Sequence, residues 1–145
     1  MRIVVDADAT PGIKLIETVA QKYQVPCILI SDDTHDIESN YSEVVTVSKG
    51  FQSVDMYLCN HLKEHDIVIT QDYGVATIAL SHNAFAIHPK GFLYTSENID
   101  NLLNSRHLHM KLRKQGKHVK GPKKRSSQDD ERLIKNLEKI ILDSL

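Results

Sequence analysis

The chain has 145 residues, of which 41% are hydrophobic and 26% are charged, as in an ordinary folded domain. No apolar run approaches the roughly 20 residues that cross a bilayer. The N-terminus lacks a secretion signal, and the two cysteines form no disulfide framework. We therefore expect a cytoplasmic protein with no membrane partner.

The net charge of −1 conceals a strong asymmetry along the chain. Residues 1–105 carry six Lys and Arg against fourteen Asp and Glu, whereas residues 106–125 carry nine Lys and Arg and no acid. An acidic body beside a basic segment favours a metal site next to a surface that grips a polyanion. The alternative is a solvated basic helix and loop without a partner.

Apolar runs and helical periodicity alternate along the chain, which predicts an α/β fold with a mostly parallel sheet flanked by helices. The expected strands are Ile3–Val5, Val25–Ile30, Val44–Val47, Asp66–Thr70 and Ala84–Ile87, with Phe92–Tyr94 as a short edge strand. The expected helices run from Pro11 to about Tyr23, from Ser53 through Leu62, over Val75–His82, from Glu97 to about Lys114, and after Ser126. Their expected N-caps are Thr10, Ser53, Thr95 or Ser96, and Ser126 with Asp129.

These elements fit a single domain of residues 1–145. Within it, residues 1–105 form an α/β core with an acidic site, residues 106–125 form a basic helix end and loop, and residues 126–145 form an added C-terminal amphipathic helix. A protein partner or a homo-oligomer is not indicated by the sequence.

Two aspartates follow the first strand directly, and two more are expected at the same edge of the sheet. Asp6 and Asp8 are two residues apart, a spacing that points strand side chains in the same direction. Asp55 opens the helix after the third strand, and Asp72 follows the fourth. Paired carboxylates repel each other, so we expect them to bind a cation such as Mg²⁺ or Mn²⁺. Each aspartate could also act only as a cap or a favourable charge in a first helical turn.

Several motifs in this order resemble the YaiI/YqxD family of uncharacterised bacterial proteins. They are Asp6-Ala-Asp-Ala-Thr-Pro11, Gly50-Phe51 with Asp55 and Tyr57, Thr70-Gln71-Asp72, Pro89-Lys90-Gly91, Leu93-Tyr94-Thr95, Asn98-Ile99, Gly121-Pro122-Lys123, Ser126 and Asp129. Thr10 stands where the family usually has Cys, and Arg125 stands where an aromatic residue is common. A thiol at position 10 is therefore not essential, and stacking at position 125 is not expected.

That family is similar to a branch of the PIN-like nuclease superfamily, which gathers acidic residues at strand ends around Mg²⁺ or Mn²⁺. The resemblance implies a three-layer PIN-like fold in which Asp6, Asp8, Asp55 and Asp72 bind metal and take part in catalysis. It implies a metal-dependent nuclease, with RNA a more probable substrate than DNA.

The basic segment supplies the expected contacts to nucleic acid. Its candidate backbone-binding residues are Lys111, Arg113, Lys114, Lys117, Lys120, Lys123, Lys124 and Arg125. Such contacts carry no base information and depend steeply on salt.

Two other functions fit the same residues. The spacing of Asp6, Asp8 and Thr10 is also that of haloacid-dehalogenase-type phosphatases, in which the first Asp is the nucleophile and the second the general acid. Against this, the next helix begins too soon for the expected flap. The second alternative is a non-catalytic PIN-like module that binds nucleic acid or protein, because a fold alone does not guarantee turnover.

Overall fold

The computed structural model describes residues 1–48, 50, 52–119 and 124–145. Its described residues form one sheet of five parallel strands in the order β3-β2-β1-β4-β5. The strands are β1 (Ile3–Asp6), β2 (Cys27–Asp32), β3 (Glu43–Val47), β4 (Ile67–Ile69) and β5 (Phe85–Ile87). The α/β class with a parallel sheet is confirmed.

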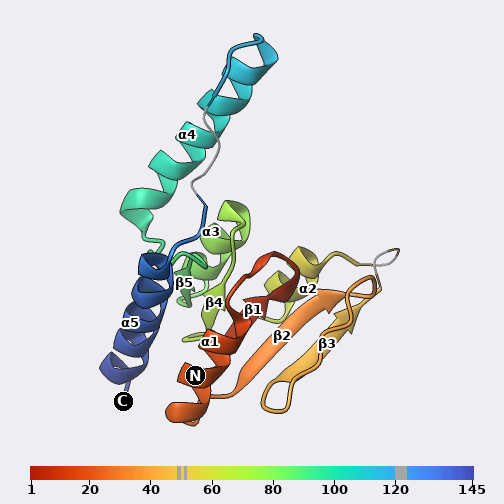
Figure 1. The fold of residues 1–145 in the computed structure, drawn as a ribbon, viewed down its shortest axis with the longest axis vertical. Helices are drawn as coiled ribbons and strands as arrows, with labels where there is room; N and C mark the ends of the chain where they lie inside the picture. The colour runs from red at the N-terminus through yellow and green to blue at the C-terminus, as the bar shows by residue number, and fades with distance from the viewer. Residues whose placement is uncertain (49, 51, 120–123) are drawn as a thin grey trace.

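Helices cover both faces of this sheet and make three layers (Figure 1). The helices are α1 (Ile13–Lys22), α2 (Val54–Asn60), α3 (Tyr73–Ser81), α4 (Ser96–Lys114) and α5 (Ser127–Asp143). On one face α1 and α5 pack against alternate strand residues such as Val5, with Leu137 of α5 fully buried. On the other face α2, α3 and the start of α4 pack against the intervening residues, such as Val4. Burial on both faces explains why the central strands β1 and β4 are continuous apolar runs.

The strand order places β1 at the centre of the sheet, between β2 and β4. From β1 the chain first builds outward through β2 and β3, then crosses back to build β4 and β5 on the other side. In open α/β sheets, ligands bind beyond the carboxyl ends of the strands where the order reverses in this way. The carboxyl ends of β1 and β4 are therefore the expected position of a site.

The predicted start of the first helix is wrong. A 3₁₀ turn over Ala7–Ala9 follows β1, and α1 begins only at Ile13, after Gly12 in a left-handed conformation with φ of 81°. The Thr10 hydroxyl does not cap this helix, since it donates to the Asp6 carbonyl oxygen at 2.6 Å. Asp6 and Asp8 therefore lie at a tight turn between β1 and α1, and neither belongs to the helix.

Other boundaries differ from prediction by one or two residues, and one predicted strand is absent. Leu93 forms an isolated antiparallel bridge with Ile87, and Phe92–Tyr94 is not a strand in the described structure. The predicted caps at Ser53 and Thr95 are confirmed, and Asp129 accepts the N–H of Ser126 at 2.9 Å. Leu62 lies beyond the end of α2.

Helix α4 leaves the body of the protein. Ile99 in its first turns is buried, whereas Leu108 and Met110 farther along are exposed. Figure 1 shows the C-terminal part of α4 extending well beyond the sheet. The basic residues at its end are therefore presented on a projecting arm.

Candidate metal centre

The end of β1 and the turn after it position the first two aspartates. Asp6 is the last residue of β1 and is only 6% exposed. Asp8 lies in the 3₁₀ turn, where its Oδ2 accepts the backbone N–H of Asp32 at 2.9 Å. This bond ties the turn to the carboxyl end of β2. The Asp8 carboxylate is thus fixed by a backbone contact from the neighbouring strand β2.

Two helix N-termini position the other two aspartates. Asp55 lies in the first turn of α2, and Asp72 is the N-cap of α3, where its Oδ1 accepts the N–H of Val75 at 3.0 Å. Burial raises the pKa of Asp55, and the neighbouring Asp72 raises it further. Asp72 therefore caps α3 and also lies close to the other aspartates.

The four aspartates converge, as the sequence predicts. Asp6, Asp8 and Asp55 line a cavity of about 310 Å³ together with Asp32 and residues 52–54. Burial, together with the negative charges of Asp55, Asp8 and Asp72, raises the pKa of Asp6 from 3.8 to about 6, while a hydrogen bond from Thr70 acts in the opposite direction. Asp72 does not line this cavity, but its effects on the pKa values of Asp6 and Asp55 place it beside them. Their roles as ligands and catalysts stay predictions.

The basic group that contacts the negative charge of this site is an imidazole, His35, whose Nδ1 lies 3.1 Å from Asp8 Oδ1. In the part of the chain that the structure describes, every ion pair of a Lys or Arg is made with another acid. In addition, the Oδ1 atom of Asp8 is buried and accepts no hydrogen bond from the described residues. An orphaned carboxylate oxygen beside mutually repelling carboxylates fits a hard divalent cation such as Mg²⁺ or Mn²⁺.

Sequence reasoning missed two residues beside this site, Asp32 and His35. Asp32 ends β2, and hydrogen bonds from Thr34 and His35 lower its pKa to about 2. The Nδ1 atom of His35 lies 3.1 Å from Asp8 Oδ1 and 3.0 Å from Asp32 Oδ1. The available signal is an aspartate just after the predicted strand Val25–Ile30, but nothing local in the sequence extends that strand to Asp32.

The predicted nucleic-acid-binding residues fall into three groups. Those that are exposed on or after α4, or before α5, are Lys111, Arg113, Lys114, Lys117 and Lys124. Lys120 and Lys123 lie outside the described residues.

Arg125 forms the third group because its side chain is engaged inside the protein. Its Nε donates to Asp130 at 2.8 Å, and its Nη1 donates to the Pro89 carbonyl oxygen at 2.6 Å. These contacts fasten the start of α5 to the loop after β5. Arg125 therefore holds the fold together at this point, and its predicted contact with nucleic acid stays untested.

Arg106 links the basic helix to the acidic site, although it was not among the predicted site residues. Its guanidinium lies 6.0 Å from the ring centroid of Tyr73, within reach of a cation–π contact. Tyr73 directly follows Asp72 in the chain. The positive charges of α4 thus begin at Arg106, against Tyr73 at the start of α3, and continue toward the end of the helix.

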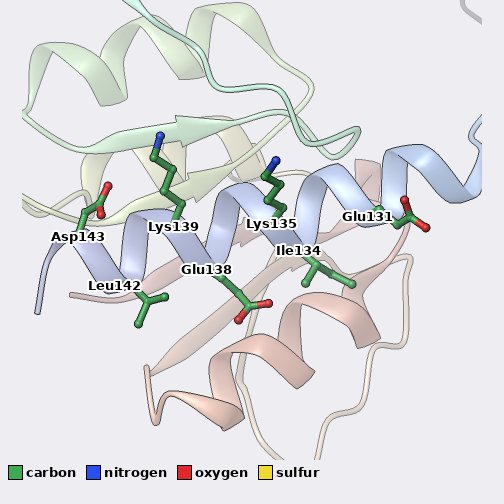
Figure 2. Close-up of a pocket in the computed structure, with 7 residues that line it drawn as sticks. All are labelled: Glu131, Ile134, Lys135, Glu138, Lys139, Leu142 and Asp143. Atoms are coloured by element: carbon green, nitrogen blue, oxygen red, sulfur yellow. The ribbon is translucent and has the colours of Figure 1, made fainter.

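A second, shallow hollow of about 580 Å³ runs along α5 and is unrelated to the four aspartates. Figure 2 shows Glu138 pointing toward α1, with Lys135 and Lys139 pointing away from it. Glu138 accepts hydrogen bonds from Tyr23 and Lys22 of the α1 region. The residues that line this hollow carry both signs of charge and do not form a cluster of one kind of polar group. The acidic cavity is therefore the better candidate site.

The fold and the site define an α/β protein with an acidic pocket at the carboxyl edge of a parallel sheet. Every helix among its described residues is too short or too polar to span a bilayer. The sequence model of the "Uncharacterized BCR, YaiI/YqxD family" matches residues 4–143, and the chain belongs to this family.

Curated relatives support this assignment over the whole chain. The chain is 52% identical to a UPF0178 protein of Clostridium novyi over 141 residues, which cover 97% of this chain and 95% of the relative. It is 44% identical to a UPF0178 protein of Natranaerobius thermophilus over 143 residues, with coverage of 98% and 96%. No solved structure matches the chain. The resemblance to the family is thereby confirmed, whereas the likeness to PIN-like nucleases stays a prediction.

Proposed function

We propose that this protein is a divalent-metal-dependent nuclease that hydrolyses phosphodiester bonds, with RNA as the favoured substrate. The observation that carries the proposal is the clustered negative charge at the ends of β1 and β4, where three neighbouring carboxylates raise the pKa of the buried Asp6. The family resemblance to PIN-like nucleases supports the same conclusion. The fold alone does not, because many activities share this architecture.

Asp6, Asp8, Asp55 and Asp72 are the residues that would hold Mg²⁺ or Mn²⁺. Such an ion would supply Lewis-acid chemistry, by offsetting the negative charge that builds on a phosphate during hydrolysis. Asp6 is buried and central, so it is the main ligand. Burial and the neighbouring Asp72 raise the pKa of Asp55, and a bound cation would favour its charged form.

The exposed basic residues of α4 would hold the substrate by its phosphates. Lys111, Arg113 and Lys114 lie in the last turn, and Arg106 lies near the aspartates beside Tyr73. A strand of nucleic acid along α4 would thereby be led toward the acidic pocket. Phosphate contacts of this kind are not specific for sequence, so we expect broad cleavage of single strands.

The proposal is tested by cleavage of labelled single-stranded RNA in Mn²⁺. The wild type is compared with Asp6→Asn and with Asp36→Asn, which changes an exposed aspartate in the loop after β2. We expect cleavage by the wild type and by Asp36→Asn, and none by Asp6→Asn. Equal cleavage by all three proteins would expose a contaminant and contradict the proposal.

An absence of cleavage by every protein would favour one of the two other functions. RNA binding that is retained in the wild type, without cleavage, would indicate a non-catalytic binding module. Hydrolysis of p-nitrophenyl phosphate that disappears in Asp6→Asn would indicate a phosphatase of the haloacid-dehalogenase type. The two assays use the same three proteins, so the alternatives are separated directly.

A further inference from the structure

A cluster of two carboxylates and one imidazole lies next to the pocket of the four aspartates. Asp8, Asp32 and His35 each offer one ligand atom, and these atoms all lie within 4.8 Å of one another. They come from the turn after β1, the end of β2 and the loop that follows it. His35 is 53% exposed, so the cluster is open to solvent on one side.

The spacing of these atoms fits coordination of one ion. Two ligand atoms bound at about 2.1 Å to one tetrahedral ion are separated by about 3.4 Å. The two separations in the structure are a few tenths of an ångström shorter, at 3.1 Å from His35 Nδ1 to Asp8 Oδ1 and 3.0 Å from His35 Nδ1 to Asp32 Oδ1. One ring nitrogen can give its proton to only one of two such oxygens in good geometry. A cation in place of that proton would serve both.

Two further observations point to a ligand. The Asp8 Oδ1 atom is buried and accepts no hydrogen bond within the described chain, which leaves it one contact short. The other Asp8 oxygen accepts the Asp32 N–H, and Asp32 Oδ1 accepts the Thr34 N–H at 2.9 Å. Such supporting bonds orient ligand carboxylates in metal sites. The donor atoms are therefore held in place before any ion binds.

We propose that Asp8, Asp32 and His35 form a separate binding site for a divalent transition metal such as Zn²⁺, adjacent to the pocket of the four aspartates and sharing Asp8 with it. The imidazole decides the selectivity, because nitrogen ligands favour Zn²⁺ and its neighbours, whereas sites of oxygen alone suit Mg²⁺ and Mn²⁺. The site shares Asp8 with the proposed nuclease centre, but Asp6, Asp55 and Asp72 are not among its ligands.

The test is calorimetric titration of the full chain, stripped of metal, with ZnCl₂ and separately with MgCl₂. The variants are His35→Gln and Asp32→Asn, and the matched control is His82→Gln, which changes an exposed histidine at the end of α3. We expect His35→Gln and Asp32→Asn to weaken Zn²⁺ binding at least tenfold, and His35→Gln to leave Mg²⁺ binding unchanged. His82→Gln should bind both ions as the wild type does.

Asp6→Asn separates this proposal from the nuclease proposal. It should keep Zn²⁺ binding at Asp8, Asp32 and His35 while it loses Mg²⁺ binding. Zn²⁺ affinity that is unchanged in His35→Gln would overturn the proposed site. An equal loss of Zn²⁺ affinity in His82→Gln would also overturn it, because binding would then be a property of surface histidines. Circular dichroism of each variant confirms that the fold is retained, as expected for a side chain as exposed as His35.

Discussion

Neutralising Asp6 should make the metal-free protein more stable at neutral pH. The pKa of this buried carboxyl is raised from 3.8 to about 6, so ionising it opposes folding. A shift of roughly two pKa units corresponds to about 3 kcal/mol, at about 1.4 kcal/mol for each unit. Asp6→Asn keeps the shape of the side chain and removes the charge. Its free energy of unfolding above pH 6 should therefore exceed that of the wild type by up to about 3 kcal/mol.

The pH dependence has a definite sign. Below pH 3.8, Asp6 is protonated in both the folded and the unfolded chain, and the two proteins should have similar stability. As the pH rises from 3.8 to about 6, the unfolded chain releases this proton first, so the wild type loses stability across that window. The variant lacks this loss. The difference between the two proteins should grow from near zero at pH 3.8 to its full value above pH 6.

Urea unfolding in EDTA at pH 4.0 and pH 7.5 measures this difference. Asp36→Asn is the control, because it removes an exposed carboxylate instead of a buried one. At pH 7.5 we expect the urea midpoint of Asp6→Asn to rise by roughly 1–2 M, given slopes of about 1–3 kcal/mol per M. Equal stability of Asp6→Asn and wild type at pH 7.5, or a gain of the same size at both pH values, would refute the electrostatic reasoning.

Three further predictions concern the support of the site and its basic arm. Gly91→Ala should destabilise the fold by about 2–4 kcal/mol in urea unfolding, because the φ angle of Gly91 is +98° and an added Cβ would lie 2.4 Å from the backbone nitrogen of Leu133. Unchanged stability would mean that α5 does not pack against this loop. Leu137→Ala should lower the free energy of unfolding by about 2–5 kcal/mol, since Leu137 is fully buried between α5 and the sheet, and a loss below 1 kcal/mol would contradict that packing. Changing both Lys111 and Lys114 to Gln should weaken single-stranded RNA binding and reduce the slope of log affinity against log salt by about 1.4, whereas an unchanged slope would exclude these exposed lysines from the interface.

The sequence predicts the fold class well because the central strands β1 and β4 are buried on both faces and thus form continuous apolar runs. It predicts strand ends less well, as β2 illustrates. The predicted strand began at Val25, but Pro26 lacks an N–H and β2 begins at Cys27. The strand then continues to Asp32, because that residue pairs with Val47 of β3. Pairing with a distant strand leaves no local signal in the sequence.

The four aspartates could be predicted as a group for a topological reason. The carboxyl ends of parallel strands meet at one edge of the sheet, so acids that follow different strands come together there. Asp32 and His35 could not be predicted in this way. Their position depends on the extension of β2 and on the bond from the Asp32 N–H to Asp8, and both are tertiary contacts. The same holds for Arg106, whose place over Tyr73 results from the packing of α4 on α3.

The acidic pocket should repel a phosphate chain, whereas the basic residues of α4 should attract it. A cation bound in the pocket would remove this conflict. A phosphate chain would be repelled by a body that carries eight more acidic than basic residues over positions 1–105. The positive residues of α4 attract the same chain, but they project away from the aspartates. Arg106, beside Tyr73, is where the two regions meet. If α4 binds nucleic acid as proposed, a divalent ion among the carboxylates would turn the local repulsion of the phosphates into attraction, so metal binding and nucleic-acid binding should strengthen each other.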